Sequence, residues 1–304
     1  RDASASLALF RTQHANAIPA GAAGGTHGHG AAVLHAQQGA RRWLREPPGK
    51  RSGRQLTADS DLCTLSGALE YDGSPLVGQD AGFLVGNQTT GVLVSAERAD
   101  AFSGADVIID FTLPAATLDN MQAARDIGAA VVLGTTGHSQ AQEDVILGFA
   151  EAVPMIWAAN YSLGVNLLLN LVERASAALP MNFDIDILEM HHREKVDAPS
   201  GTALVMGKAA AKGRGQDFDG VKNLSREGQT GKRPSGEIGF ATLRGGTVPG
   251  EHVVVFAGDD ERIEIGHRAG DRHIFARGAV QAATWLAGKQ PALYTMNDVL
   301  GLND

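Results

Sequence analysis

Cysteine, long apolar runs and positive charge are all scarce in this sequence. Cys63 is the only cysteine, so no disulfide can form within the chain, and such usage is typical of a reducing compartment. No apolar run approaches the roughly 20 residues of a membrane-spanning helix, and the first residues lack the charged and apolar regions of a signal peptide. We therefore expect a cytoplasmic protein that does not bind membranes.

Positive charge is in the minority. Lys and Arg number 26 against 34 Asp and Glu, which gives a net charge of −8. A mildly acidic chain is a poor candidate for binding nucleic acid. The composition, with 43% hydrophobic and 20% charged residues, is that of a globular protein, and 304 residues suffice for one large domain or two ordinary ones.

The first 60 residues differ in composition and apolar pattern from the rest of the chain. They are rich in Gly, Ala, Arg and His and have few periodic apolar positions. A run of basic residues between Arg41 and Arg54 is interrupted only by Glu46. This composition predicts a disordered or poorly packed arm, and the alternative is a basic arm that binds nucleic acid.

From Leu62 onward, apolar segments of strand length alternate with amphipathic segments of helix length. Gly128 stands where a glycine commonly ends a helix. The alternation predicts βαβ units and a parallel sheet. The expected strands are residues 63–70, 105–112, 129–137 and 154–160, and the expected helices are 114–128 and 140–153.

The second half of the chain has a different pattern. A long apolar helix at 162–180 is followed by alternating segments, which predict an antiparallel or mixed sheet. The predicted fold is therefore α/β, with a Rossmann-like parallel-sheet nucleotide-binding domain and a second α+β domain built on a mixed sheet. The expected strands are 183–192, 236–246, 250–260 and 261–270, and the closing helix is 273–289.

A nucleotide-binding domain of this type expects a glycine-rich turn after its first strand, where backbone amides hold a pyrophosphate. The candidate is "GAAGGTHGHG", residues 21–30. No clean apolar strand precedes it, since that segment contains Pro19, and no amphipathic helix clearly follows. A flexible glycine-rich tail is the alternative interpretation.

Three later segments end expected strands of the parallel sheet, where ligands bind in such folds. Glu70 can bind ribose hydroxyls, or it can be an ordinary carboxylate at a strand end. The small residues of Gly134–Gly137 and Ala158–Ser162 follow two further strands and would let a cofactor lie against the backbone. The two turns together are a stronger signal than either alone.

The stretch "EMHHREKVDAPSGTAL", residues 189–204, concentrates titratable side chains just before an expected helix. Ser200 is a natural N-cap, and the amides of Gly201 and Thr202 would be available to an anion. Together these features predict a pocket for a small carboxylate substrate with an acid beside it; the alternative is a charged surface loop that caps a helix. The groups that add positive charge or donate protons are His191, His192, Arg193 and Lys195.

A metal site is not expected in this stretch. Adjacent residues of a strand point to opposite faces, so His191 and His192 cannot jointly bind one metal ion. The single cysteine lies elsewhere in the sequence, which argues against zinc.

The same stretch resembles the signature of the dihydrodipicolinate reductase family, also called 4-hydroxy-tetrahydrodipicolinate reductases. Its His-His-x-x-Lys-x-Asp-Ala-Pro-Ser-Gly-Thr block is highly specific. The resemblance runs from about Leu65 to Leu302, and further segments match in order, among them "VIIDFTLPAATLDN", "VVLGTTG", "WAANYSLGVNLLLNLVE" and "GEIGFATLRGGTVPGEHVVVFAG".

The resemblance implies an enzyme that reduces a cyclic, conjugated imine dicarboxylate with NADH or NADPH. The product would be tetrahydrodipicolinate, on the route to diaminopimelate and lysine. The resemblance assigns acid–base chemistry to His191 and proton donation to Lys195. It assigns binding of the small dicarboxylate substrate to His192, Gly201, Thr202 and Arg272.

On the cofactor side, the resemblance implies that Glu70 binds the ribose hydroxyls. Many family members follow this acid with an arginine that can take the 2′-phosphate of NADPH. Tyr71 stands there in this chain, so we expect a preference for NADH over NADPH. The residues implied to line the nicotinamide and its ribose are Gly134, Thr135, Thr136, Ala158, Ala159, Asn160 and Tyr161.

The resemblance also implies a domain organisation. A dinucleotide-binding domain is expected over 1–161, with 1–60 atypical, and a substrate-binding and oligomerisation domain over 162–274. Residues 275–304 are expected to return to the first domain. Family members are usually homotetramers built through the sheets of their second domains, so a homotetramer is expected.

The largest departure from the family is at the N-terminus. The family begins with a clean apolar strand and a Gly-x-x-Gly-Arg-Met-Gly turn, whereas this chain has "AIPAGAAGGTHGHG". Gly21 and Gly24 fit the turn as cofactor-binding glycines, but the Arg-Met-Gly is missing. The alternative function is therefore a non-catalytic homologue with a damaged cofactor loop, which binds dicarboxylates or assembles with other subunits.

We hypothesise that residues from about Gly25 to Leu56 arose by a reading-frame disruption of an ordinary family gene. The motivation is the abrupt shift to Arg, Gly, Pro and His without an amphipathic pattern. Resequencing the locus tests this hypothesis directly. An intact frame in the transcript, with a matching protein mass, would contradict this hypothesis.

Overall fold

The computed structural model describes residues 31–36, 63–84 and 89–303. The chain divides into two compact units. The first comprises the chain up to Ser162 together with His273–Val299, and the second comprises Leu163–Arg272 with Leu300–Asp304. No helix in the described ranges is long and apolar enough to cross a membrane. The functions expected for the two domains stay predictions.

The first unit is built on a seven-stranded sheet, ordered β12-β6-β5-β4-β1-β2-β3. The pairs β4–β5, β5–β6, β6–β12 and β2–β3 are parallel, which confirms the Rossmann-like class. The strands are β1 (Ala31–Ala36), β2 (Cys63–Leu69), β3 (Val94–Ser95), β4 (Val107–Asp110), β5 (Ala130–Leu133), β6 (Pro154–Trp157) and β12 (Ala292–Tyr294).

Helices cover both faces of the central strands. Successive residues of β5 point to opposite faces, and Val131 and Val132 are both buried. α3 and α4 share a core cluster with Val131, and α8 packs against β4, β5 and β6. Gly128 ends α3 in the left-handed conformation, as predicted. The helices are α1 (Ala81–Leu84), α2 (Arg98–Ala101), α3 (Pro114–Ile127), α4 (Gln140–Phe149), α8 (His273–Leu286) and α9 (Met296–Leu300).

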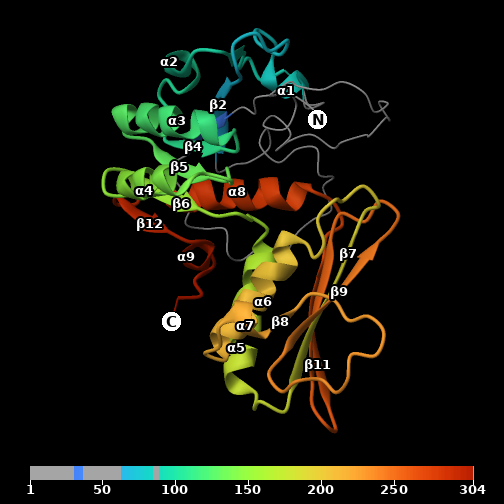
Figure 1. The fold of residues 1–304 in the computed structure, drawn as a ribbon. Helices are drawn as coiled ribbons and strands as arrows, with labels where there is room; N and C mark the ends of the chain where they lie inside the picture. Colours follow the sequence, from blue (N-terminus) through green and yellow to red (C-terminus); the bar gives the residue numbers. More distant parts are fainter. Residues whose placement is uncertain (1–30, 37–62, 85–88, 304) are drawn as a thin grey trace, which may run out of the picture. The chain divides into compact units, whose positions relative to one another are not determined.

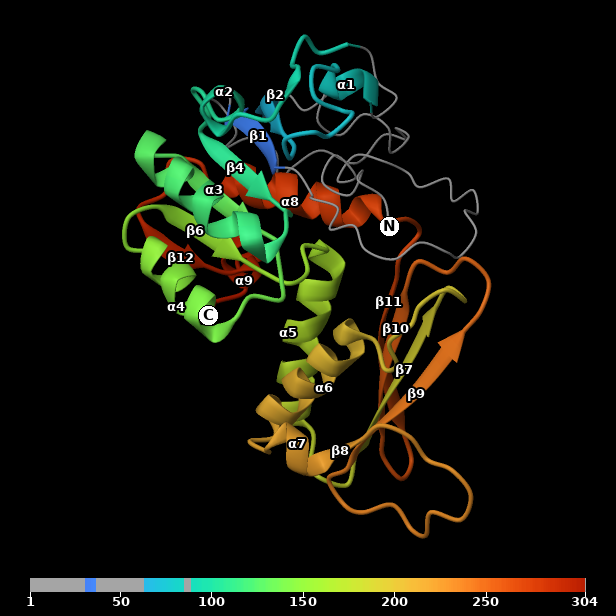
Figure 2. The same cartoon turned by 45° about the horizontal axis from the view of Figure 1, so that its top comes forward.

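β1 is the exception to the parallel order. Ala31 pairs with Leu69 and Asp110, the last residues of β2 and β4, whereas Ala36 pairs with Cys63, the first residue of β2. β1 therefore runs antiparallel between its two neighbours (Figure 2). The expected parallel order is therefore wrong for β1. The expectation of an arm without regular structure is also wrong for these 6 residues, which form a strand. The backbone groups of β2 and β4 need a partner, and "AAVLHA" contains no proline or glycine to prevent pairing.

The second unit is built on a five-stranded sheet, ordered β11-β10-β7-β9-β8. The pairs β7–β10 and β10–β11 are antiparallel and the pairs β7–β9 and β8–β9 are parallel, which confirms the predicted mixed sheet. In Figure 1, α5 and α6 lie along one face of this sheet. The elements are α5 (Leu163–Ala178), β7 (Asp184–His191), α6 (Gly201–Gly213), α7 (Phe218–Val221), β8 (Lys222–Asn223), β9 (Ile238–Arg244), β10 (Glu251–Ala257) and β11 (Arg262–Arg268).

The face of this sheet toward the helices changes character along the strands. One cross-strand row is apolar and packs in the core: Phe240, Ile187, Val254 and Ile265. Two residues further along β7, the next row on the same face is polar: Thr242, Glu189, His252 and His267. The candidate site begins at this second row, where the core gives way to buried polar groups.

Candidate active site

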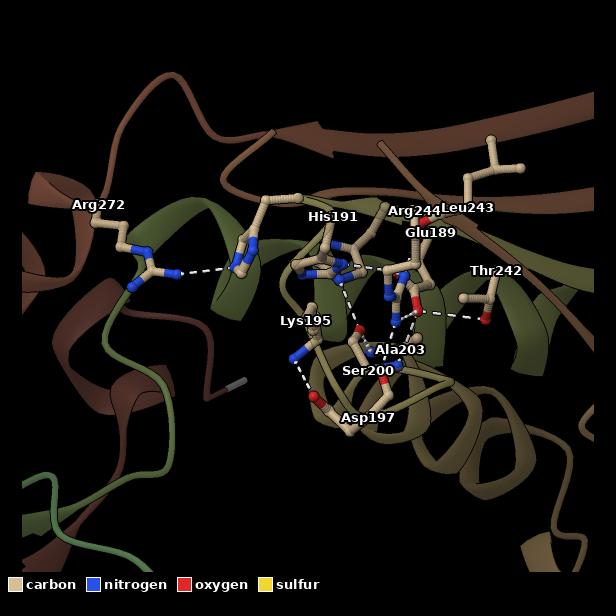
Figure 3. A network of polar contacts seen from close by, with 12 residues as sticks. Glu189, His191, Lys195, Asp197, Ser200, Ala203, Thr242, Leu243, Arg244 and Arg272 are labelled. Atoms are coloured by element: carbon tan, nitrogen blue, oxygen red, sulfur yellow. Dashed lines mark hydrogen bonds and ion pairs between the residues drawn. The ribbon is translucent and has the colours of Figure 1, made fainter. Parts of the chain in front are cut away.

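Strand β7 brings Glu189 and His191 to the same face of the sheet because they are two residues apart. The Glu189 side chain is fully buried, and His191 is only 8% exposed. The Nδ1 atom of His191 lies 2.6 Å from Oε2 of Glu189. The acid–base candidate of the sequence analysis is therefore held by a buried carboxylate, as Figure 3 shows.

The Glu189 carboxylate is surrounded by donors from three elements. Arg244 on β9 donates from Nη1 to Oε2 (2.8 Å) and from Nη2 to Oε1 (2.9 Å). The amide of Ser200 donates to Oε1 (2.9 Å), and so does the hydroxyl of Thr242 (3.3 Å). Burial opposes ionisation of this carboxyl, but the hydrogen bonds from Arg244, His191 and Ser200 outweigh it and lower the pKa of Glu189.

Ser200 caps the N-terminus of α6, as predicted. Its Oγ accepts from the amide of Ala203 at 3.2 Å and lies 3.1 Å from Nε2 of His252. His252 is 4% exposed, and its ring meets that of His191 edge-on at 5.1 Å. Burial, followed by the proximity of His191, lowers the pKa of His252 to about 4. His252 is therefore neutral near pH 7.

The remaining charged candidates lie around the start of α6. Lys195 Nζ forms an ion pair with Asp197 Oδ1 at 2.7 Å, and the hydrogen bond from Lys195 lowers the pKa of Asp197. The Nη2 atom of Arg272 lies 3.1 Å from Nε2 of His192. Burial and then the charge of Arg272 lower the pKa of His192. Arginine has no acceptor, so His192 accepts through Nε2 and is neutral in this contact.

The residues expected to hold an anion through their amides form the first turn of α6. Gly201 is exposed, with no atom within 4 Å of the position that a Cβ would occupy. Thr202 is partly exposed. The second unit therefore brings six predicted residues into one region: His191, His192, Lys195, Gly201, Thr202 and Arg272. Among the described residues, no group of three or more His, Cys, Asp or Glu side chains is arranged to hold a metal ion.

Four residues of this cluster were not predicted from the sequence: Glu189, Thr242, Arg244 and His252. A signal for Glu189 was present, because a residue two positions before His191 on a strand shares its face. Thr242, Arg244 and His252 had no comparable signal. They lie on β9 and β10, and only the strand register brings them beside β7.

In the first unit, the cofactor candidates lie at the carboxyl ends of strands. Glu70 follows β2; it is buried, and its Oε2 accepts from the amide of Tyr71 at 3.4 Å. Asp110 ends β4 and accepts from the amide of Thr112 (2.7 Å) and from Asn120 Nδ2 (3.0 Å). This buried Asp110 cluster, which the sequence analysis did not identify, fixes the turn that follows β4.

The turn after β5 is packed closely against its neighbours. A Cβ on Gly134 would lie 2.3 Å from the ring of Phe111, so any larger residue there would have to displace that ring. The Oγ1 of Thr135 donates to the carbonyl of Thr112 (3.0 Å), and Trp157 Nε1 donates to the carbonyl of Thr135 (3.3 Å). Thr136 is exposed. The turn therefore presents backbone and a small side chain to solvent from a rigid base.

The turn after β6 divides into exposed backbone and a buried aromatic ring. Ala158 and Asn160 are partly exposed and Ala159 is exposed. Tyr161 is 1% exposed, and its hydroxyl bonds to the carbonyls of Leu133 (2.8 Å) and Ile156 (3.1 Å). The Tyr161 side chain thus braces two strand ends. Gly21 and Gly24, the other cofactor candidates, lie outside the described residues.

A Rossmann-like unit together with a unit that carries a buried acid–base cluster defines the class of two-domain, nucleotide-dependent oxidoreductases. Two family models match the chain: dihydrodipicolinate reductase, N-terminus, over residues 51–161, and dihydrodipicolinate reductase, C-terminus, over residues 164–300. The chain belongs to the dihydrodipicolinate reductase family.

Curated relatives support the same family at high identity. The 4-hydroxy-tetrahydrodipicolinate reductase of Rhodopseudomonas palustris (strain BisB5) is 52% identical over 257 residues, 84% of this chain and 95% of that protein. The enzyme of the same name from Afipia carboxidovorans is 53% identical over 257 residues, 84% and 94% of the two chains.

The fold also has a solved counterpart. The dipicolinate-bound dihydrodipicolinate reductase from Paenisporosarcina sp. TG-14 matches with a TM-score of 0.57 and 22% identity, over 68% of this chain and 78% of that chain. At this identity the match supports the fold alone.

The lowered pKa of His252 predicts acid sensitivity. In the unfolded chain a histidine has a pKa near 6.5, so stability is complete above that pH and falls as the pH drops toward about 4. Between pH 7 and pH 5 this residue should remove about 2 kcal/mol from the free energy of unfolding. His252→Gln, which keeps a polar atom near Ser200, should flatten this loss in urea titrations.

The comparison of wild type with His252→Gln isolates this residue, because the lowered pKa values of His192 and His267 act in the same direction in both proteins. Parallel losses in wild type and His252→Gln would refute the assignment.

Proposed function

We propose that this protein reduces 4-hydroxy-tetrahydrodipicolinate to tetrahydrodipicolinate with NADH or NADPH, in the cytoplasm, on the route to diaminopimelate and lysine. The carrying observation is the His191–Glu189 pair beside the start of α6, in a chain about 50% identical to reductases of that name. Replacing a hydroxyl by hydrogen consumes a hydride and a proton and releases water. NAD(P)H, when bound, supplies the hydride.

Delivery of the proton to the substrate is assigned to two side chains of the second unit. His191 acts as the acid–base residue, with its ring held by Glu189. Lys195 donates a proton from its ammonium group, which Asp197 holds at 2.7 Å. Both residues can therefore present a proton to a ring that has accepted a hydride.

The two carboxylates of the substrate need several donors and positive charges. The amides of Gly201 and Thr202 at the start of α6 supply donors and the positive end of the helix dipole. His192 and Arg272, which contact each other at 3.1 Å, supply a second group of donors. In this proposal the guanidinium of Arg272 exchanges its contact with His192 for a substrate carboxylate.

The cofactor is assigned to the carboxyl edge of the sheet in the first unit. Glu70 binds the ribose hydroxyls, and the exposed backbone of the turns after β5 and β6 receives the nicotinamide and its ribose. Their small residues leave the backbone accessible, which fits a flat ring. Tyr71 stands where an arginine would take the 2′-phosphate, so NADH is the preferred cofactor.

The direction of β1 bears on where the pyrophosphate of the cofactor could bind. The pyrophosphate turn of such folds follows the carboxyl end of β1, at the same edge as the ends of β2 and β4. Here β1 is antiparallel, so Ala36 lies at the opposite edge. The described residues therefore supply candidates for the nicotinamide half of the cofactor, and the candidates for its pyrophosphate, Gly21 and Gly24, lie outside them.

A homotetramer is proposed from the outer face of the sheet in the second unit. Leu188 and Leu243 are 39% and 49% exposed there, in register with partly exposed residues of β10 such as Val253. Sedimentation should give four times the chain mass, and Leu188→Glu should dissociate the assembly. Val145→Glu, on the exposed side of α4, is the control. An intact tetramer in Leu188→Glu would contradict this interface.

The function is tested by separating cofactor binding from turnover. His191→Gln and Lys195→Met should each lower turnover by about 100-fold or more, because each removes a proton donor. Their affinity for NADH, measured by fluorescence titration, should change less than about threefold, since neither residue is assigned to the cofactor. Titration of wild type with NADPH should give the weaker binding.

Lys212→Met provides a matched control, because Lys212 also pairs with a carboxylate, Glu173 Oε1 at 2.8 Å, but lies on the exposed side of α6. Its turnover should equal that of wild type. Unchanged turnover in both site variants would refute the assigned roles. Absence of measurable NADH and NADPH binding by wild type would instead support the non-catalytic homologue.

A further inference from the structure

We propose that Glu189 is a positioning residue that fixes the His191 ring as the Nδ1–H tautomer, leaving Nε2 as the nitrogen that exchanges a proton. The tautomer follows from geometry alone. Its consequence for turnover rests on the proposed function, in which His191 is the acid–base residue.

First, Glu189 carries a negative charge because of the donors around it. Arg244 approaches both of its oxygens, at 2.8 and 2.9 Å, in the two-pronged arrangement that a guanidinium makes with a carboxylate. The Ser200 amide adds a third donor at 2.9 Å. None of these groups can accept a proton, so the carboxyl is kept ionised.

The second step is the direction of the hydrogen bond to His191. An ionised carboxylate accepts but cannot donate. The 2.6 Å contact between Oε2 and Nδ1 must therefore carry the proton on Nδ1. In the neutral ring this leaves the lone pair on Nε2, and in the protonated ring it leaves Nε2–H as the proton to be given away.

The third step is the surroundings of Nε2. A Cβ on Gly250 would lie 2.9 Å from this nitrogen, so any larger residue at that position would crowd it. The His252 ring packs edge-on against His191 and limits its rotation. Because His252 is neutral near pH 7, it does not compete for the charge of Glu189 there.

The arrangement has a chemical consequence. The carboxylate beside Nδ1 fixes the orientation of the ring, and the ion pair with Arg244 keeps the proton of this contact on Nδ1 rather than on Glu189. His191 can then cycle between imidazole and imidazolium at Nε2 without turning its ring.

Glu189→Gln gives a sharp test because the surroundings dictate how glutamine would sit. Three donors meet at the Oε1 position, from Arg244, Ser200 and Thr242, and these would select the amide oxygen. The amide NH2 would then take the Oε2 position, where Nη1 of Arg244 would have to turn away and Nδ1 of His191 would have to accept. We expect the variant to invert the tautomer to Nε2–H.

The measurement is nitrogen NMR of the full chain labelled with ¹⁵N-histidine, with the His191 signal assigned by its loss in His191→Gln. Wild type should show Nδ1–H with an unprotonated Nε2 at alkaline pH. Glu189→Gln should show the opposite, and its turnover should fall about 100-fold while the KM for substrate changes less than about threefold.

Two variants serve as controls. Thr242→Val removes a 3.3 Å donor from the same carboxylate but leaves its charge, so it should keep the Nδ1–H tautomer and lose far less turnover than Glu189→Gln. Glu189→Asp retains a carboxylate and should also keep Nδ1–H.

The outcomes separate this inference from the proposed function. An Nε2–H tautomer in wild type overturns the inference whatever the activity, and it decides the matter even if Glu189→Gln does not fold. Wild-type turnover in a folded Glu189→Gln overturns the positioning role. A wild type with the Nδ1–H tautomer and no turnover supports the inference and rejects the proposed function.

Discussion

A buried carboxylate that must be ionised organises the second unit. Glu189 has no solvent contact, and an unpaired charge in such a place is unfavourable by several kcal/mol. The chain therefore brings a guanidinium from β9, an amide from the start of α6 and an imidazole from β7 itself to the two oxygens. Because these donors come from separate elements, satisfying one charge fixes how two strands and a helix meet.

Such a cluster determines how its side chains are arranged more than it stabilises the fold. A buried ion pair is often no more stabilising than well-packed apolar side chains, although removing one partner costs about 3–5 kcal/mol. The apolar row through Ile187 and Val254 already supplies a core. One row further along, the same strands carry Glu189 and His252. The helix that covers them, α6, begins there, and the first amides of a helix have no partner within the helix. The candidate site thus begins on the same strands, one row beyond the point where the apolar core ends.

The sequence predicted this region well where the signal was local. The block from His191 to Thr202 is contiguous, so its strand, N-cap and charged turn could all be read from residue types and spacing. Alternation likewise predicted the parallel and mixed sheets. The partners of Glu189 were missed because Arg244 and His252 lie more than fifty residues away and only strand register brings them in. The roles given to the site residues stay proposals.

The first strand shows a failure of a different kind. Composition predicted an arm without regular structure, since Ala31–Ala36 is too short to display a period. What decides its conformation is the space between β2 and β4, whose backbone groups require a partner from some segment. An antiparallel segment satisfies those groups. Compared with a parallel strand, however, its amino and carboxyl ends lie at opposite edges of the sheet. The carboxyl end of β1 therefore lies at the edge opposite to the carboxyl ends of β2 and β4. What remains at the carboxyl edge is local: a buried Asp110 that fixes one turn and a glycine under the Phe111 ring that fixes the next.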